Sequence, residues 1–158
     1  METRYLARDF MEIALNEAEI AKQNGDVPVG TVITLNGEII AKSHNQVVLL
    51  NDCLAHAEIL AIKEASQKIQ QKHLIDCDMY VTLEPCPMCA GAIVLARIRR
   101  IYIGTDDPKT GAGGSIYNIL QDKKLNHYCE VYSGISQAQC SKILSDFFTK
   151  IRNEKQKL

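Results

Sequence analysis

The stretch Met79-Tyr-Val-Thr-Leu-Glu-Pro-Cys-Pro-Met-Cys-Ala-Gly91 predicts a buried β-strand that passes directly into an α-helix. Residues 79–83 are apolar, aromatic or β-branched, as in strands from the interior of a sheet. A helix is expected over Cys86–Ala96, because prolines at positions 85 and 87 are tolerated at a helix start. A further strand at Arg100–Gly104 follows. This strand-helix-strand order is typical of α/β proteins.

The rest of the chain continues the alternation of helices and strands. Asn36-Gly37 is a strong hairpin signal between two strands, and Ser136 with Gln139 predicts a capping box ahead of the last helix. We therefore predict one domain over residues 1–158, a three-layer α/β/α sandwich with a central mixed five-stranded sheet. The other expected elements are a helix with apolar positions from Phe10 to Ala21 that ends at Gly25, strands at Val29–Leu35 and Glu38–Ala41, a helix from about His56 to Lys68, a Gly-rich loop at Thr105–Ser115, a strand at Cys129–Ser133 and a helix at about 137–153.

The composition is that of an ordinary globular protein, with 46% hydrophobic and 23% charged residues. The longest apolar run, Ala90–Ala96, is too short for a membrane span. Residues 1–10 carry charges and lack the apolar core of a secretory signal, so we expect a cytoplasmic protein. Residues 1–60 carry a net charge of −5 and residues 97–158 a net charge of +5. This asymmetry permits a polyanionic partner but does not require one, since solvated helix faces produce the same counts.

Cys86 and Cys89 are the closely spaced pair among six cysteines. Their spacing at a helix start lets both sulfurs bind one metal ion, and the helix dipole favours the thiolate form. Taken alone, C-x-x-C is equally typical of a zinc site and of a dithiol redox centre. The remaining cysteines are expected to be inert: Cys53, Cys77, Cys129 and Cys140.

The segment Leu54-Ala-His-Ala-Glu58 favours zinc over redox chemistry. One imidazole and two thiolates leave the fourth zinc position open for water, as in catalytic sites. Residues two apart point to different sides of a helix, so His56 and Glu58 can share a site only if His56 lies at or before the first turn. H-x-E followed by P-C-x-x-C is the signature of zinc deaminases. We predict His56, Cys86 and Cys89 as zinc ligands and Glu58 as the catalytic acid and base.

The predicted chemistry is hydrolytic deamination. Zinc lowers the pKa of bound water towards ~7, which makes a nucleophile available at neutral pH. Glu58 can accept the proton of that water and later deliver a proton to the departing amine, so that ammonia leaves.

The chain resembles the bacterial tRNA-specific adenosine deaminases, members of the cytidine/deoxycytidylate deaminase superfamily, over nearly its whole length. The resemblance implies a cytidine-deaminase-like fold, one Zn²⁺ per subunit, a homodimer, and conversion of adenosine to inosine at the wobble position of a tRNA anticodon stem-loop, with tRNA-Arg as the expected substrate. The stretches that carry it are Asp26-Val-Pro-Val-Gly30, Asn45, Ala55-His-Ala-Glu-Ile59, Tyr80–Ile93, Asp107-Pro-Lys-Thr-Gly-Ala-Gly-Gly-Ser115, Leu144-Ser-Asp-Phe-Phe148 and Arg152.

The resemblance also implies a set of substrate-binding residues. Asn45 would hydrogen-bond the flipped nucleotide; the alternative is an asparagine that only forms a turn. The 107–115 loop would contact the RNA backbone, although an ordinary surface loop is possible, and residues 27–29 would form an apolar wall or merely the entry to a strand. Phe147 and Phe148 lie on adjacent helix faces, so one is expected in the core and the other at the pocket. The full set is Val27, Pro28, Val29, Asn45, Ala57, Glu84, Pro85, Asp107, Lys109, Phe148 and Arg152.

The chain departs from the family pattern ahead of the predicted zinc histidine. Asn51-Asp-Cys-Leu54 replaces the usual His-Asp-Pro-Thr, residues 46–50 lack arginines, and Ile151 replaces a tail arginine. Binding energy for the anticodon stem could be redistributed to the arginines at 97, 99 and 100. The alternatives are a small-molecule deaminase such as a guanine deaminase, a thioredoxin-like dithiol protein, and a zinc-stabilised binding module without catalysis.

Overall fold

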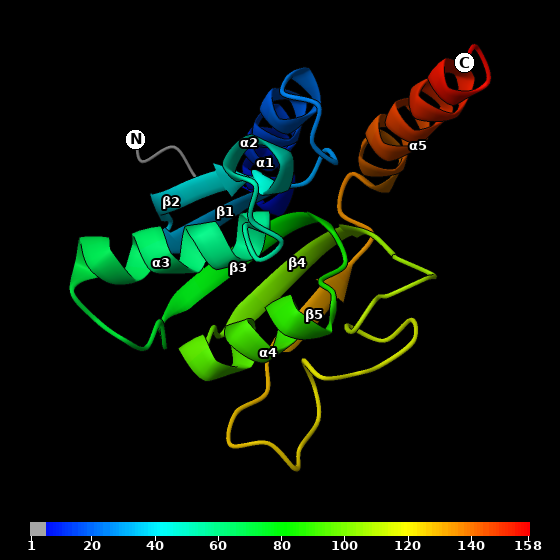
Figure 1. The fold of residues 1–158 in the computed structure, drawn as a ribbon. Helices are drawn as coiled ribbons and strands as arrows, with labels where there is room; N and C mark the ends of the chain where they lie inside the picture. The colour runs from blue at the N-terminus through cyan, green and yellow to red at the C-terminus, as the bar shows by residue number, and fades with distance from the viewer. Residues whose placement is uncertain (1–5) are drawn as a thin grey trace.

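A mixed five-stranded sheet forms the centre of the protein (Figure 1), and the computed structural model describes residues 6–158. The strands lie in the order β2-β1-β3-β4-β5; β1 is antiparallel to β2 and β3, whereas β3, β4 and β5 are mutually parallel. This confirms the expected sheet. The strands are β1 (Gly30–Leu35), β2 (Glu38–His44), β3 (Cys77–Leu83), β4 (Arg100–Thr105) and β5 (Glu130–Ser133).

Helices cover both faces of the sheet, which confirms the three-layer sandwich (Figure 1). On one face α3 and α4 pack beside each other over an apolar cluster that includes Ala61, Met79 and Ile93. On the other face α1 and α5 enclose a smaller cluster that includes Phe10 and Tyr80. The helices are α1 (Ala7–Gln23), α2 (Val47–Leu50), α3 (Ala57–Ile69), α4 (Pro87–Ala96) and α5 (Gln137–Lys155).

The prediction that residues 1–10 are not a secretory signal falls partly on residues 1–5, which lie outside the described residues. Among the helices of residues 6–158, none has both the length and the apolar character needed to cross a membrane.

The strand directions bring several chain segments to one edge of the sheet. The parallel strands β3, β4 and β5 all end there, β2 also ends there, and β1 begins there. The turn after β3, the loop after β4, the first residues of α5 and the segments flanking the hairpin therefore meet at this edge. Polar residues collected in this way form the ligand sites of many α/β proteins.

Local sequence signals place most of the elements correctly. Asn36 and Gly37 have φ values of 53° and 78°, the positive pair that the expected hairpin turn requires. Gly25, at φ 79°, follows α1 as the predicted stop. His56 and Cys86 are the N-cap residues of α3 and α4, so the condition that His56 precede the first turn is met.

Three local predictions are wrong or incomplete. Ser136 adopts a left-handed conformation with φ 53° and makes no side-chain capping bond, so the capping box does not form. The short helix α2 was not expected, because its apolar residues do not form a helical stripe and its order depends on a distant side chain, as shown below. β2 continues to His44, where the imidazole Nδ1 lies 2.7 Å from Glu17 Oε2 of α1.

The six cysteines are all free thiols. Burial raises the pKa of Cys77 to about 11 and that of Cys129 and Cys140 to about 12, so these three thiols stay protonated at neutral pH. This agrees with their expected inertness, whereas Cys53 is exposed.

A Gly30→Ala substitution should destabilise the protein. A Cβ at position 30 would fall against the backbone of α1 at Ala14 and Ala18, so that helix would have to move away from β1. Overpacking of this kind costs about 1–3 kcal/mol, occasionally more, which urea unfolding would measure. Asn16→Ala on the exposed side of the same helix is the control, with an expected change within about 0.5 kcal/mol. Equal stability of Gly30→Ala and the unmodified protein would contradict close packing of α1 on β1.

Candidate metal centre

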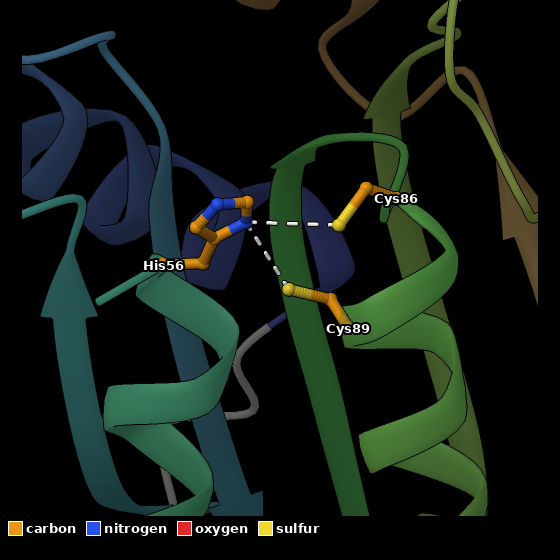
Figure 2. A group of neighbouring side chains, drawn as sticks. All are labelled: His56, Cys86 and Cys89. Atoms are coloured by element: carbon orange, nitrogen blue, oxygen red, sulfur yellow. Dashed lines mark hydrogen bonds between the residues drawn. The ribbon is translucent and has the colours of Figure 1, made fainter. Parts of the chain in front are cut away.

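Three potential ligand atoms converge between the N-termini of α3 and α4 (Figure 2). His56 Nδ1 lies 3.4 Å from Cys89 Sγ and 3.7 Å from Cys86 Sγ, and the three atoms lie within 4.8 Å of one another. A tetrahedral ion with bonds of about 2.0–2.3 Å holds its ligand atoms roughly 3.5 Å apart, so these separations fit zinc. Within residues 6–158 this group consists of three ligand atoms, which leaves a fourth position for a small ligand.

Local structure explains how the three side chains reach one point. His56 has extended backbone angles of φ −73° and ψ 150°, and its side chain leaves α3 at the N-terminus. Cys86 is the N-cap of α4 and Cys89 lies in its first turn. The unpaired N–H groups and dipoles of both helices favour negative charge at this point, as two thiolates require.

The electrostatics of the two thiols differ. The hydrogen bond from the Cys89 thiol, supported by His56, lowers the pKa of Cys86 to about 4. The same contact and burial raise the pKa of Cys89, and the hydrogen bond with Cys86 raises the pKa of His56. Without a metal the pair holds one thiolate at neutral pH, and binding of a cation displaces the remaining proton.

Glu58 lies beside the ligand group in the first turn of α3 and is 4% exposed. Its Oε2 lies 3.5 Å from Cys89 Sγ, within hydrogen-bonding distance of the thiol. Burial raises the pKa of the Glu58 carboxyl, which moves its titration towards neutral pH. A carboxyl group with that property is suited to accepting and returning a proton.

A cavity of about 450 Å³ opens above Glu58 and the ligand group, a size typical of small-molecule sites. Its walls come from the edge of the sheet described above, together with α2 and α5. The lining residues are Gly25, Asp26, Val27, Val29, Asn45, Val47, Val48, His56, Glu58, Leu83, Glu84, Cys86, Asp107, Thr110, Phe147 and Ile151.

A second cavity of about 630 Å³ adjoins the first and shares five lining residues with it: Val27, Leu83, Asp107, Thr110 and Ile151. Its outer wall carries basic and aromatic side chains: Lys109, Phe148, Arg152 and Lys155. Phe147 is buried, as expected for one of the two rings, but it also lines the first cavity, whereas Phe148 is 43% exposed and lines the second.

The predicted substrate-binding residues fall into three groups. Val27, Val29, Asn45, Glu84 and Asp107 line the first cavity, and Val27 and Asp107 also belong to the second. Lys109, Phe148 and Arg152 line only the second. Pro28, Ala57 and Pro85 are buried and line neither cavity.

Asn45 and Asp107 both use their side chains within the protein. Asn45 Oδ1 accepts a hydrogen bond of 2.9 Å from Ala57 N–H and so caps α3 from outside, while Nδ2 has no partner among residues 6–158. Asp107 accepts hydrogen bonds from Lys109 N–H and from the backbone and hydroxyl of Thr110, which fold the loop after β4 into a tight turn.

Sequence reasoning did not single out Asp26, α2 or Phe147 as parts of the site. Asp26 is buried, and its carboxylate accepts hydrogen bonds from the N–H groups of Val48 (2.8 Å) and Leu49 (3.2 Å), which orders α2. Val47 and Val48 thereby reach the cavity wall. The sequence Asp26-Val-Pro-Val marks this region, but it does not indicate that Asp26 binds backbone N–H groups more than twenty residues further along the chain.

The arginines suggested as substitute RNA contacts lie at the opposite edge of the sheet. Arg99 Nε is 3.1 Å from Asp78 Oδ1, and Arg100 Nε is 3.2 Å from Glu130 Oε2. Arg97 follows the C-terminal end of α4, whereas Cys86 precedes its beginning. These positions do not support a contact with a ligand in either cavity beside the metal centre.

Comparisons with known proteins agree with the geometry. Residues 7–152 match the family model of MafB19-like deaminases. The chain is 44% identical to a tRNA-specific adenosine deaminase of Bacillus subtilis, over 92% of this chain and 91% of the relative. A solved structure from a study of A-to-I editing by tRNA:A34 deaminases is similar with a TM-score of 0.83 and 46% identity, covering 86% of this chain and 99% of that one. A guanine deaminase structure from Bacillus subtilis is similar with a TM-score of 0.62 and 36% identity, covering 65% of this chain and 66% of that one.

Alkylation of the metal-stripped protein should select Cys86. At about pH 6 a thiol whose pKa is near 4 is a thiolate, whereas the thiols of Cys77, Cys129 and Cys140 remain protonated. In a Cys53→Ser background, iodoacetamide should therefore label Cys86 at this pH, and zinc should prevent the labelling. Peptide mass spectrometry measures both results. Equal labelling with and without zinc would argue against Cys86 as a ligand.

Proposed function

The chain belongs to the MafB19-like deaminases and to the tRNA-specific adenosine deaminases, and we propose that its substrate is the wobble adenosine, position 34, of tRNA-Arg. The reaction replaces the amino group on C6 of adenine by oxygen, so adenosine and water become inosine and ammonia. The observation that carries the proposal is the buried carboxyl of Glu58 beside the three convergent ligand atoms, at the end of a cavity large enough for a nucleoside.

The metal in this proposal is one Zn²⁺ per subunit, held by His56, Cys86 and Cys89. The separations of these atoms and their mixed nitrogen and sulfur character support zinc. When bound, zinc would supply Lewis-acid activation of a water molecule. The protein would supply the proton transfers and the position of the base.

Glu58 performs the proton transfers in this mechanism. Its raised pKa and its place beside the ligand atoms allow Oε2 to take a proton from the attacking water and give it to N1 of adenine. Glu58 then takes the proton of the hydroxyl group added to C6 and gives it to the amino group, so that ammonia leaves and the C6 carbonyl of inosine remains. Exclusion of bulk water around the 4% exposed carboxyl strengthens each of these interactions.

The walls of the first cavity hold the base. Val27 and Val29 present apolar surface to the purine, and the free Nδ2 of Asn45 donates a hydrogen bond to an acceptor on the flipped nucleotide. The base has to leave its stack to enter, so a single-stranded loop is a better substrate than a duplex.

The second cavity and α5 contact the rest of the anticodon stem-loop. Lys109, Arg152 and Lys155, which line the second cavity, would bind phosphates, and the exposed ring of Phe148 would stack on a flanking base. In this proposal α5, including residues 137–153, is the RNA-contacting helix of a single deaminase domain. A protein with this substrate acts in the cytoplasm, where tRNA is processed and used.

A homodimer is the proposed assembly, and the outer surface of α4 supports it. The sequence of α4, Pro-Met-Cys-Ala-Gly-Ala-Ile-Val-Leu-Ala, is almost wholly apolar around the helix. Helices of that composition are normally buried on all sides, yet Leu95 is 78% exposed. Met88, Gly91 and Ala92 are also partly exposed. A second subunit against this surface would cover it.

The substrate is tested by offering RNA and small molecules to the same preparation. An anticodon stem-loop with adenosine at position 34 should be converted to the inosine form, whereas free guanine, adenosine and cytidine should be turned over poorly. The rate at low RNA concentration should fall steeply with salt, because phosphate contacts release counterions. Efficient turnover of guanine with untouched RNA would replace this proposal by a guanine deaminase.

Glu58→Ala tests the assigned proton transfers in the same assay. We expect a loss of about 10²–10⁴-fold or more in the deamination rate, with zinc content still near one per subunit. Glu64→Ala, at an exposed position of the same helix, is the matched control and should keep full activity. Wild-type turnover in Glu58→Ala would remove this residue from the mechanism.

Leu95→Glu tests the proposed dimer surface. A charge in the centre of an apolar interface should weaken association about tenfold or more, which sedimentation over a concentration series would measure. Gln139→Glu, exposed on α5 on the other side of the sheet, adds the same charge and should leave association unchanged. Unchanged association of Leu95→Glu would place the interface elsewhere.

A further inference from the structure

Glu84 is a buried carboxylate that binds the loop after β4. It lies directly after β3 and is 3% exposed. Its oxygens accept hydrogen bonds from the backbone N–H groups of Asp107 (3.1 Å), Gly113 (2.9 Å) and Ser115 (3.1 Å). The Ser115 hydroxyl donates a fourth hydrogen bond to the same carboxylate.

The contacts of Glu84 tie this loop to the segment that carries a metal ligand. The next residue, Pro85, accepts a hydrogen bond of 2.8 Å from Ala112 N–H through its carbonyl oxygen, and Cys86 follows. Glu84 N–H itself donates to Thr105 O at the end of β4, at 2.9 Å. The loop over residues 107–115 is therefore held by five hydrogen bonds to a two-residue segment immediately before Cys86.

Gly111 supports the same arrangement by steric means. A Cβ at this position would fall against the Glu84 carboxylate and the backbone oxygen of Asp107. Only a residue without a side chain lets the loop approach Glu84 this closely.

The carboxylate of Glu84 has little capacity left for a substrate. A carboxylate offers about four acceptor positions, and four donors from the loop already use them. A buried carboxylate without such donors would be strongly unfavourable, so its position and that of the loop depend on each other. This saturation favours a role in holding the loop over the direct substrate contact expected from the sequence.

The loop brings four residues, 107–110, to the two cavities. Asp107 and Thr110 line both the first and the second, whereas Lys109 lines only the second. Their distance from the metal ligands is set through Glu84, because Glu84 precedes Cys86 by two residues on the same short segment.

We propose that Glu84 is a positioning residue that holds the 107–115 loop, and with it Lys109, at a fixed distance from the metal centre. This inference rests on the proposed function, since Lys109 is assigned there to the RNA. RNA is thereby bound by the loop in register with Glu58. Loss of the Glu84 contacts would let the loop and Lys109 move away from their position, and binding of the RNA would weaken.

The experiment compares Glu84→Gln with Glu130→Gln in the full-length protein. Glutamine has nearly the same size but only one oxygen, and its amide N–H groups face the donors of the loop. Glu130 is an exposed glutamate at the opposite edge of the sheet, where it accepts from Arg100 and Tyr132, so its substitution should change none of the measurements.

The first measurement is amide hydrogen exchange of Gly113 and Ser115, which needs no substrate. We expect exchange in Glu84→Gln to be about tenfold faster or more, because a local contact that closes these amides has been lost. Unchanged amide exchange in Glu84→Gln would show that Glu84 does not hold the loop. Failure of the wild-type protein to deaminate RNA would overturn the proposed function alone.

The second measurement is steady-state deamination of the anticodon stem-loop. In Glu84→Gln the KM should rise about tenfold while kcat changes less than about threefold, and zinc content should stay near one. Lys109→Ala alone should also raise the KM of the otherwise unmodified protein. Added to Glu84→Gln, the same substitution should raise KM by less than about twofold, because the lysine no longer reaches its phosphate. If Lys109→Ala raised KM equally with and without Glu84→Gln, then Glu84 would not position Lys109, and the proposal would be overturned.

Ser115→Ala keeps the proposal testable if Glu84→Gln does not fold. It removes one donor at an exposed residue and leaves the carboxylate in place. Faster exchange at Gly113 with a KM increase of about two- to threefold supports the positioning role. Wild-type exchange and wild-type KM would contradict it.

Discussion

Two helices that begin side by side at one edge of the sheet are the constraint on which the site depends. Because α3 and α4 both start at this edge, an imidazole and two thiols meet within hydrogen-bonding range. Asn45 stabilises the start of α3 through its bond to Ala57 N–H. Displacement of either helix by a turn would separate His56 from Cys86 by about 5 Å, and the ligand group would not exist.

Much of the fold and of the ligand group could be predicted because it depends on interactions between residues close together in the sequence. The hairpin at Asn36-Gly37 and the position of His56 ahead of its helix depend on residues within one or two turns of the chain, and such signals can be read directly. The errors occurred where a distant partner decides the conformation. Ser136 takes up a left-handed turn after β5 instead of capping α5, and α2 is ordered by Asp26, 22 residues before Val48.

The candidate site divides in the same way. The ligand group and Glu58 follow from residue types at fixed spacing, and the structure brings them together. The role of Glu84 could not be read from its neighbours, because the groups that bind it lie 23 to 31 residues further along the chain. The pairing of Arg99 with Asp78 likewise depends on strand order, and so the basic half of the sequence does not form a single basic surface.

The low pKa of Cys86 has a consequence for the life of the protein before it acquires metal. A thiolate at neutral pH is the form of cysteine that peroxides oxidise, and oxidation beyond the sulfenic acid is largely irreversible. The other buried thiols are protected by protonation, so damage in an oxidising cell would concentrate on the newly folded, metal-free chain. A metal ion bound as proposed would occupy the sulfur of Cys86, and so it would protect this thiolate from oxidation in addition to any role in the reaction.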